Sequence, residues 1–181
     1  MDRRIPGIKG EYLWEFEIPE RQIMALAEVI AAEKYSWRPA ARARSVSEVF
    51  VHIAAGNLLL LDMVGVSVPE DLYGQIEGDV FRRVEAIGRR NDELEKAITD
   101  KADVVALLRR SLEAVKDSFT NTTDGELARQ GHFFGEETTV RRVYLRMLAH
   151  MNEHMGQMVA YARSIGIAAP WPDWCRKAPI C

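Results

Sequence analysis

Residues 45–65 read SVSEVFVHIAAGNLLLLDMVG, and this stretch decides the fold class. It opens with a capping box, in which Ser45 and Glu48 each satisfy a free backbone N–H at the start of a helix. Apolar residues then recur at helical spacing as far as Gly65, a residue type that often follows the last turn. The pattern predicts a helix that runs to Met63 and stops near Gly65.

The segment from Val49 to Val66 contains one charged residue, Asp62, and is near the length of a membrane span. His52 and Asn57 also interrupt it, and its flanks lack the Lys/Arg bias and the aromatic belts of a span. We therefore expect a helix buried at the centre of a soluble bundle, without contact with a membrane.

Three further segments have helical periodicity. The first is Tyr12–Ala32, where Pro19 marks either a kink or the true start; the second is Asp100–Asn121; and the third runs from Thr138 or Thr139 to Ile165. The expected inward stripes are Trp14, Ile18, Ile23, Leu26, Ala27 and Ile30 in the first, and Ala102, Val105, Leu108, Leu112, Val115 and Phe119 in the second.

The segments between these helices hold the residues that favour turns. Residues 66–78 contain Pro69, Gly74 and Gly78 and predict a connection with one short helical turn at most, whereas residues 80–99 are polar and helical in part. Gly131–Gly135 is irregular or briefly extended. Since no segment alternates with period two, we predict an all-α antiparallel four-helix bundle with a long connection between its second and third helices.

Composition indicates an ordinary soluble protein. The 181 residues include 48% hydrophobic and 28% charged residues, without repeats or low-complexity linkers, so we expect one domain over residues 1–181. The 24 basic and 27 acidic residues are spread along the chain. Without a basic block or tail, nothing predicts nucleic-acid binding.

Cysteine usage and the N-terminus favour the cytoplasm. Cys175 and Cys181 lie together near the end of the chain, without the spacing of a zinc site or of a disulfide framework. Residues 1–20 carry charges throughout and lack the apolar run of an export signal. Both features fit a reducing compartment.

Three of the four histidines fall on expected inward faces. His150 and His154 are four residues apart, which places both imidazoles on one helix face, and His52 shares a buried stripe with Val49 and Gly56. A buried imidazole without a partner costs about 1–3 kcal/mol. A single divalent metal ion would satisfy all three, and we predict His52, His150 and His154 as its ligands.

A second interpretation applies to each histidine alone. A single histidine on an apolar face is usually a core residue bonded to a backbone carbonyl. The three together favour the metal site. The remaining histidine, His132, lies in a glycine-flanked loop and is expected at the surface or at a pocket rim.

With these residues identified, the sequence resembles the DinB/YfiT-like superfamily of metal-binding four-helix bundles. The matching segments are SVSEVFVHIAAGN at residues 45–57 and HMNEHMGQ at residues 150–157, with one histidine on the second helix and an HxxxH pair on the fourth. The tail with Trp171, Pro172 and Trp174 is similar to that of many relatives.

The resemblance implies that the three histidines bind a divalent ion, often nickel or zinc, and leave positions open to water or substrate. Some relatives are transferases or isomerases that use a low-molecular-weight thiol such as bacillithiol or mycothiol, and relatives commonly form dimers. It therefore implies a small-molecule substrate, a low-molecular-weight thiol as co-substrate, and a homodimer.

Two polar residues are candidates for the pocket beside the metal. Asn57 follows His52 by five residues and Gln157 follows His154 by three; each is equally expected to bond across the bundle instead. Glu153 neighbours His154 and should point to a different face. The sequence therefore names no general base.

Three classes of function remain open. The favoured class is a metal-dependent enzyme on small molecules, either a thiol-dependent transferase or a hydrolase. The second is a zinc peptidase, because His150–His154 matches the H-x-x-E-H pattern. The third is a non-catalytic protein whose metal is structural or sensory.

Overall fold

The computed structural model describes residues 7–171 and places helix α2 (Val46–Val64) at the centre of a helical bundle. The predicted capping box is present: the Ser45 hydroxyl accepts from the Glu48 N–H, and the Glu48 carboxylate accepts from the Ser45 N–H. Gly65 ends the helix with φ 103°, a left-handed conformation that favours glycine. Although α2 is long and apolar enough to cross a membrane, 72% of its apolar window is buried inside the protein, as expected for a core helix.

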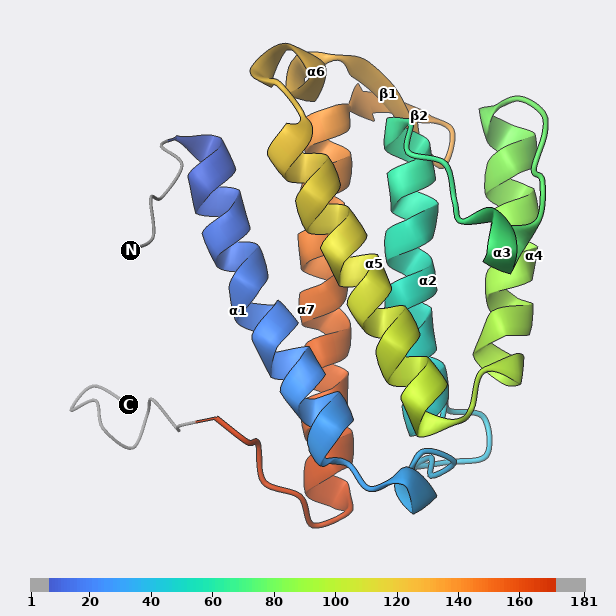
Figure 1. Cartoon of the computed structure of the whole chain (residues 1–181), viewed down its shortest axis with the longest axis vertical. Helices are drawn as coiled ribbons and strands as arrows, with labels where there is room; N and C mark the ends of the chain where they lie inside the picture. Colours follow the sequence, from blue (N-terminus) through green and yellow to red (C-terminus); the bar gives the residue numbers. More distant parts are fainter. Residues whose placement is uncertain (1–6, 172–181) are drawn as a thin grey trace.

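Four long helices form the bundle: α1 (Ile8–Val29), α2, α5 (Lys101–Asn121) and α7 (Val140–Ser164). Helices α1 and α7 run in one direction and α2 and α5 in the other (Figure 1). Both α1 and α2 pack against α5 and α7. The chain is thus an all-α bundle, as predicted, with one small hairpin among the described residues.

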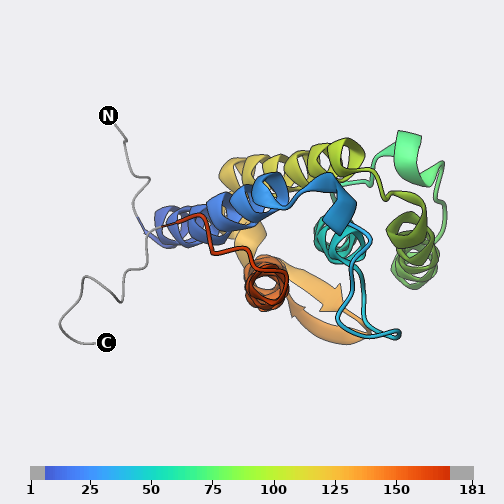
Figure 2. The same cartoon turned by 90° about the horizontal axis from the view of Figure 1, so that it is seen from below.

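The long connection between α2 and α5 is itself mostly helical. After a short helix α3 (Glu70–Tyr73), helix α4 (Val80–Ala97) carries the chain back along the bundle, which the parallel course of α2 and α5 requires. The sequence predicted only partial helix here, whereas Asp79 caps a continuous one. Figure 2 shows α4 beside α2, outside the group formed by the other long helices.

Polar contacts hold α4 against α2 and α3, because most side chains of α4 are polar or charged. The Asp62 carboxylate, the one charge of α2 beyond its first turn, pairs with the guanidinium of Arg83. The buried Asn91 amide donates to the Ala55 carbonyl oxygen and accepts from the Tyr73 hydroxyl. These bonds fix which face of α4 meets the bundle.

The predicted stripe of α1 was wrong before Pro19. Trp14 and Ile18 are exposed, and the buried residues in this part are Tyr12, Phe16 and Pro19 itself. The helix continues through Pro19, so the inward face is continuous from Tyr12 to Ile23 and coincides with the predicted stripe only from Ile23 onward. In α5, similarly, Val104 replaces Val105 as the fully buried residue, and Ala102 is exposed.

Short elements complete the chain: a 3-10 turn (Ala32–Lys34), helix α6 (Asp124–Ala128) and strands β1 (Gln130–Phe133) and β2 (Glu136–Thr139). The strands pair antiparallel, with Phe133 opposite Glu136, so the expected extended piece is a hairpin. Its two turn residues, Phe134 and Gly135, have φ of 48° and 90°. The hairpin packs against α2 and α7 and covers one end of both.

Candidate metal centre

The three predicted histidines meet between α2 and α7. The imidazole centroid of His52 lies 5.0 Å from that of His150 and 4.7 Å from that of His154, and the last two are 4.6 Å apart. One ring nitrogen from each lies within 4.8 Å of the other two. The described residues therefore contain a cluster with the donor set of a metal site.

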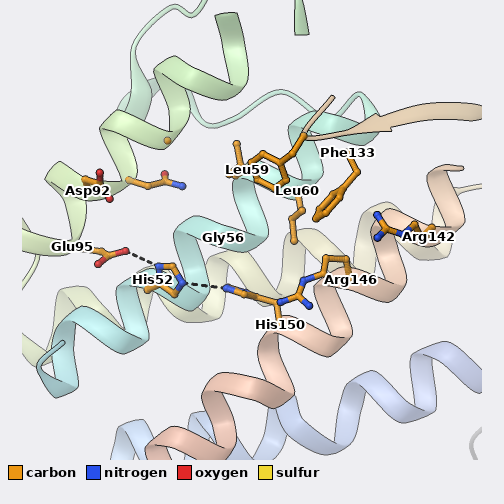
Figure 3. Close-up of a pocket in the computed structure, with 13 residues that line it drawn as sticks. His52, Gly56, Leu59, Leu60, Asp92, Glu95, Phe133, Arg142, Arg146 and His150 are labelled. Atoms are coloured by element: carbon orange, nitrogen blue, oxygen red, sulfur yellow. Dashed lines mark hydrogen bonds and ion pairs between the residues drawn. The ribbon is translucent and has the colours of Figure 1, made fainter. Parts of the chain in front are cut away.

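One pair of ring nitrogens has the separation of two ligands on one ion. Nε2 of His52 and Nε2 of His150 are 3.2 Å apart (Figure 3). Two nitrogens bound at 2.0–2.1 Å to a tetrahedral ion are about 3.3 Å apart. The two imidazoles thus face each other as ligands would.

Gly56 makes room for this approach. It lies one turn after His52 on α2, and a Cβ atom built on it would be 2.6 Å from Cε1 of His150, closer than real Cβ contacts. A side chain at this position would therefore displace the imidazole. The sequence placed Gly56 on the inward stripe without indicating this steric role.

Glu95 orients His52 from the flanking helix α4. Its Oε1 lies 2.6 Å from Nδ1 of His52, and its Oε2 accepts from Nε of Arg44 at 2.7 Å. Burial acts to raise the pKa of the Glu95 carboxyl, but the hydrogen bonds from His52 and Arg44 outweigh it and lower the pKa. An ionised carboxylate on Nδ1–H leaves Nε2 of His52 as the ligating nitrogen, a common arrangement around bound metals.

Gln157 has the corresponding role for His154. Its Oε1 lies 2.8 Å from Nδ1 of His154, and its Nε2 donates to the Tyr161 hydroxyl at 3.0 Å. The Tyr161 hydroxyl donates in turn to the backbone carbonyl of Arg44. Gln157 therefore lies at the cluster, where it holds the His154 imidazole in place.

The electrostatics of His150 and His154 favour the neutral imidazole, the form that binds metals. Burial, with smaller contributions from His154 and His52, lowers the pKa of His150 to about 3. Burial also lowers the pKa of His154, although its hydrogen bond with Gln157 acts against this. Within residues 7–171, the buried Nδ1 of His150 has no hydrogen-bond partner. These features fit a divalent ion held by His52, His150 and His154.

Asn57 does not lie at the cluster, which corrects the prediction that it lines the pocket. It is completely buried, and its Nδ2 donates to Oγ of Ser111 on α5 at 3.4 Å. Five residues along a helix correspond to a rotation of about 140° from His52, so the amide faces another helix.

The remaining polar residues singled out in the sequence lie outside the cluster. His132 is exposed on β1 near the exposed ring of Phe81. Glu153 is exposed, and its carboxylate is engaged by the guanidinium of Arg146. A peptidase of the H-x-x-E-H type needs this carboxylate as a general base, and the ion pair gives that function no support.

A cavity of about 500 Å³ opens beside His52 and His150 (Figure 3). Leu59 and Leu60 of α2 and Phe133 and Phe134 of the hairpin form its apolar part. Its polar lining comes from α4 and α7, through Asn91, Asp92, Glu95, Arg142 and Arg146. The candidate centre is therefore accessible to a small molecule from one side.

The fold and the cluster define a helical bundle with a three-histidine centre that can hold a metal ion. The model of the DinB superfamily matches residues 15–158, and the chain belongs to this superfamily.

Solved structures of the same family agree with the fold. A DinB-like protein from Bacillus cereus ATCC 10987 is similar, with a TM-score of 0.56, 20% sequence identity, and coverage of 92% of this chain and 97% of that one. A DinB-like protein from Bacillus subtilis has a TM-score of 0.55 and 20% identity, with coverage of 91% and 96%. The search of curated proteins found no match.

Sequence reasoning did not identify Glu95, Arg44 or the steric role of Gly56. For Glu95 a signal exists: Ile87, Asn91, Leu94 and Glu95 recur at helical spacing and form the buried face of α4. A carboxylate on such a face needs a partner. The sequence alone does not say that this partner is His52.

Proposed function

We propose that this protein is a metal-dependent enzyme that acts on small molecules, of the thiol-dependent transferase or hydrolase type. One observation carries the proposal: two of the three clustered imidazoles, those of His52 and His150, line a cavity of about 500 Å³. Structural zinc sites are usually closed by four protein ligands, whereas catalytic sites use three and keep a position free. Among the described residues, the cluster has three members.

The chain's own residues have separable roles in such an enzyme. Nickel or zinc would be held by His52, His150 and His154, and when bound would supply Lewis acidity and lower the pKa of a water or thiol. Glu95 and Gln157 fix the tautomers of His52 and His154. Leu59, Leu60 and Phe133 exclude water from one wall of the cavity.

The size of the cavity favours a small substrate. Its volume falls within the range of small-molecule sites, which are concave and largely apolar with a few polar groups. The resemblance to thiol-dependent relatives adds the expectation of a low-molecular-weight thiol as co-substrate. Because one fold can host many functions, membership of the family does not by itself establish the reaction.

Cobalt substitution tests the proposal directly. In protein loaded with Co²⁺, a thiol or a hydroxamate that enters the cavity should shift the visible absorption spectrum on titration. His52→Ala should lose the shift together with the ion, whereas His132→Ala, which changes an exposed histidine outside the cluster, should keep it. A cobalt spectrum that does not respond to any of these ligands would show a closed, non-catalytic centre.

A further inference from the structure

We propose that the substrate or co-substrate carries a carboxylate that binds the guanidinium of Arg142, at the end of the cavity away from the histidines. This inference rests on the proposed function, and it specifies the class of molecule: an organic acid whose reacting group and carboxylate are separated by an apolar segment. Arg142 is then a specificity-determining residue.

Arg142 shares a helix face with the metal cluster. Arg142, Arg146 and His150 occur at intervals of four residues on α7, and all three line the cavity. Four-residue steps keep the three side chains on one side of the helix. The Cα atoms of Arg142 and His150 are about 12 Å apart along the helix axis. Figure 3 shows the three side chains in this order, with Phe133 beside Arg142.

The charge of Arg142 is not neutralised within the described part of the chain. Arg146 is engaged by the Glu153 carboxylate, whereas no carboxylate among residues 7–171 forms an ion pair with Arg142. Instead, its guanidinium carbon lies 4.6 Å from the centroid of the Phe133 ring. Stacking on an aromatic ring holds the guanidinium plane while its N–H edges remain available for a bidentate carboxylate.

The rest of the cavity fixes the orientation of an anionic ligand. Asp92 and Glu95 lie on α4, on the side opposite Arg142 in Figure 3, so an anion is repelled there. Glu95 is itself committed to His52 and Arg44. Leu59 and Leu60 line the cavity as well and favour an apolar segment between the two ends of the ligand.

Two thiols that differ only in their far end test this inference. Protein loaded with Co²⁺ is titrated with ω-mercaptohexanoate and with ω-mercaptohexanol, and the dissociation constant is read from the visible spectrum. We expect the acid to bind about three- to tenfold tighter than the alcohol at low ionic strength, because it gains a charge-assisted hydrogen bond. Added salt should reduce this preference.

The matched variants are Arg142→Gln and Arg141→Gln, which remove neighbouring exposed arginines of the same helix; Arg141 does not line the cavity. Arg142→Gln should abolish the preference for the acid, and Arg141→Gln should retain it. Equal affinities of the wild type for acid and alcohol, or an unchanged preference in Arg142→Gln, would overturn the inference while both thiols still shift the spectrum. If neither thiol shifts the spectrum, the proposed function fails as well.

Discussion

Nδ1 of His52 and Oε1 of Glu95 lie 2.6 Å apart and connect the central helix α2 to the flanking helix α4. Because Glu95 is buried and also held by Arg44, its carboxylate can fix both the tautomer and the plane of the His52 imidazole. The three candidate ligands lie on the bundle helices α2 and α7, whereas the Glu95 carboxylate that holds His52 comes from α4, outside the four-helix bundle. The geometry of the centre therefore depends on how α4 packs.

Glu95→Gln should weaken metal binding by about 10- to 100-fold, the usual effect of losing a partner that orients a ligand. The amide still accepts a hydrogen bond from His52, but the charge is gone and Arg44 loses its ion pair. Competition with a chromophoric chelator measures the affinity. Glu93→Gln, an exposed carboxylate of the same helix that pairs with Arg90, is the matched control and should bind normally. Equal affinities in the two variants would refute a role for Glu95.

Metal content should follow the cluster and not the total number of histidines. The purified protein is expected to hold close to one divalent ion per chain, and a double variant, His150→Ala with His154→Ala, should hold none. Elemental analysis gives both values, and His132→Ala should match the wild type. The assignment of the ligands would be wrong if the double variant kept its metal.

Gly56→Ala should disturb the centre without unfolding the bundle. The added Cβ would lie 2.6 Å from the His150 ring, so the imidazole must move and metal affinity should fall. Gly156→Ala, on the same helix as His150, adds a Cβ with nothing within 4 Å and should raise the free energy of unfolding by about 0.5–1 kcal/mol. Thermal unfolding and metal titration of both variants separate the steric effect from helix propensity. Normal metal affinity in Gly56→Ala would show that the close approach is not required.

Much of the fold was predictable because its signals are local. Ser45, Asp100 and Thr139 cap helices at the predicted starts, since each supplies an oxygen to free backbone N–H groups of the first turn. The meeting of the three histidines also followed from local periodicity, because inward faces of packed helices share one interior.

What could not be predicted depends on tertiary packing. Glu95 and His52 are separated by 43 positions, and no local pattern pairs them. The helical extent of the polar segment that forms α4 was underestimated for the same reason. Its position against α2 is fixed by tertiary bonds such as the ion pair between Asp62 and Arg83. In α1, Trp14 fits an apolar stripe as well as Phe16 does, and only packing distinguishes them.

Removal of the metal should leave the bundle helical. The buried core extends over all four bundle helices and includes Phe16, Phe50, Leu108 and Tyr144, so folding does not depend on a metal as it does in a zinc finger. Far-UV circular dichroism before and after chelation should be nearly the same. Loss of most of the helical signal would identify the metal as structural and contradict the proposed enzyme.

The metal-free protein should lose stability as the pH falls below about 6.5. Burial lowers the pKa of His150 to about 3 in the folded chain, against 6.5 for the ordinary side chain. Between these values the unfolded state binds more protons, so the stabilisation is complete above pH 6.5 and is lost as the pH falls toward 3. By pH 5 the loss from this one group reaches at most about 2 kcal/mol.

Urea unfolding at pH 7, 6 and 5 in the presence of a chelator measures this dependence, above the range where most carboxylates titrate. His150→Asn should have a shallower slope of unfolding free energy against pH, while His132→Asn should retain the wild-type slope. Since His154 is shifted in the same direction, part of the slope should remain in His150→Asn and disappear when His154 is changed as well. A wild-type protein whose stability does not change from pH 7 to pH 5 would show that the imidazoles are solvated rather than buried between α2 and α7.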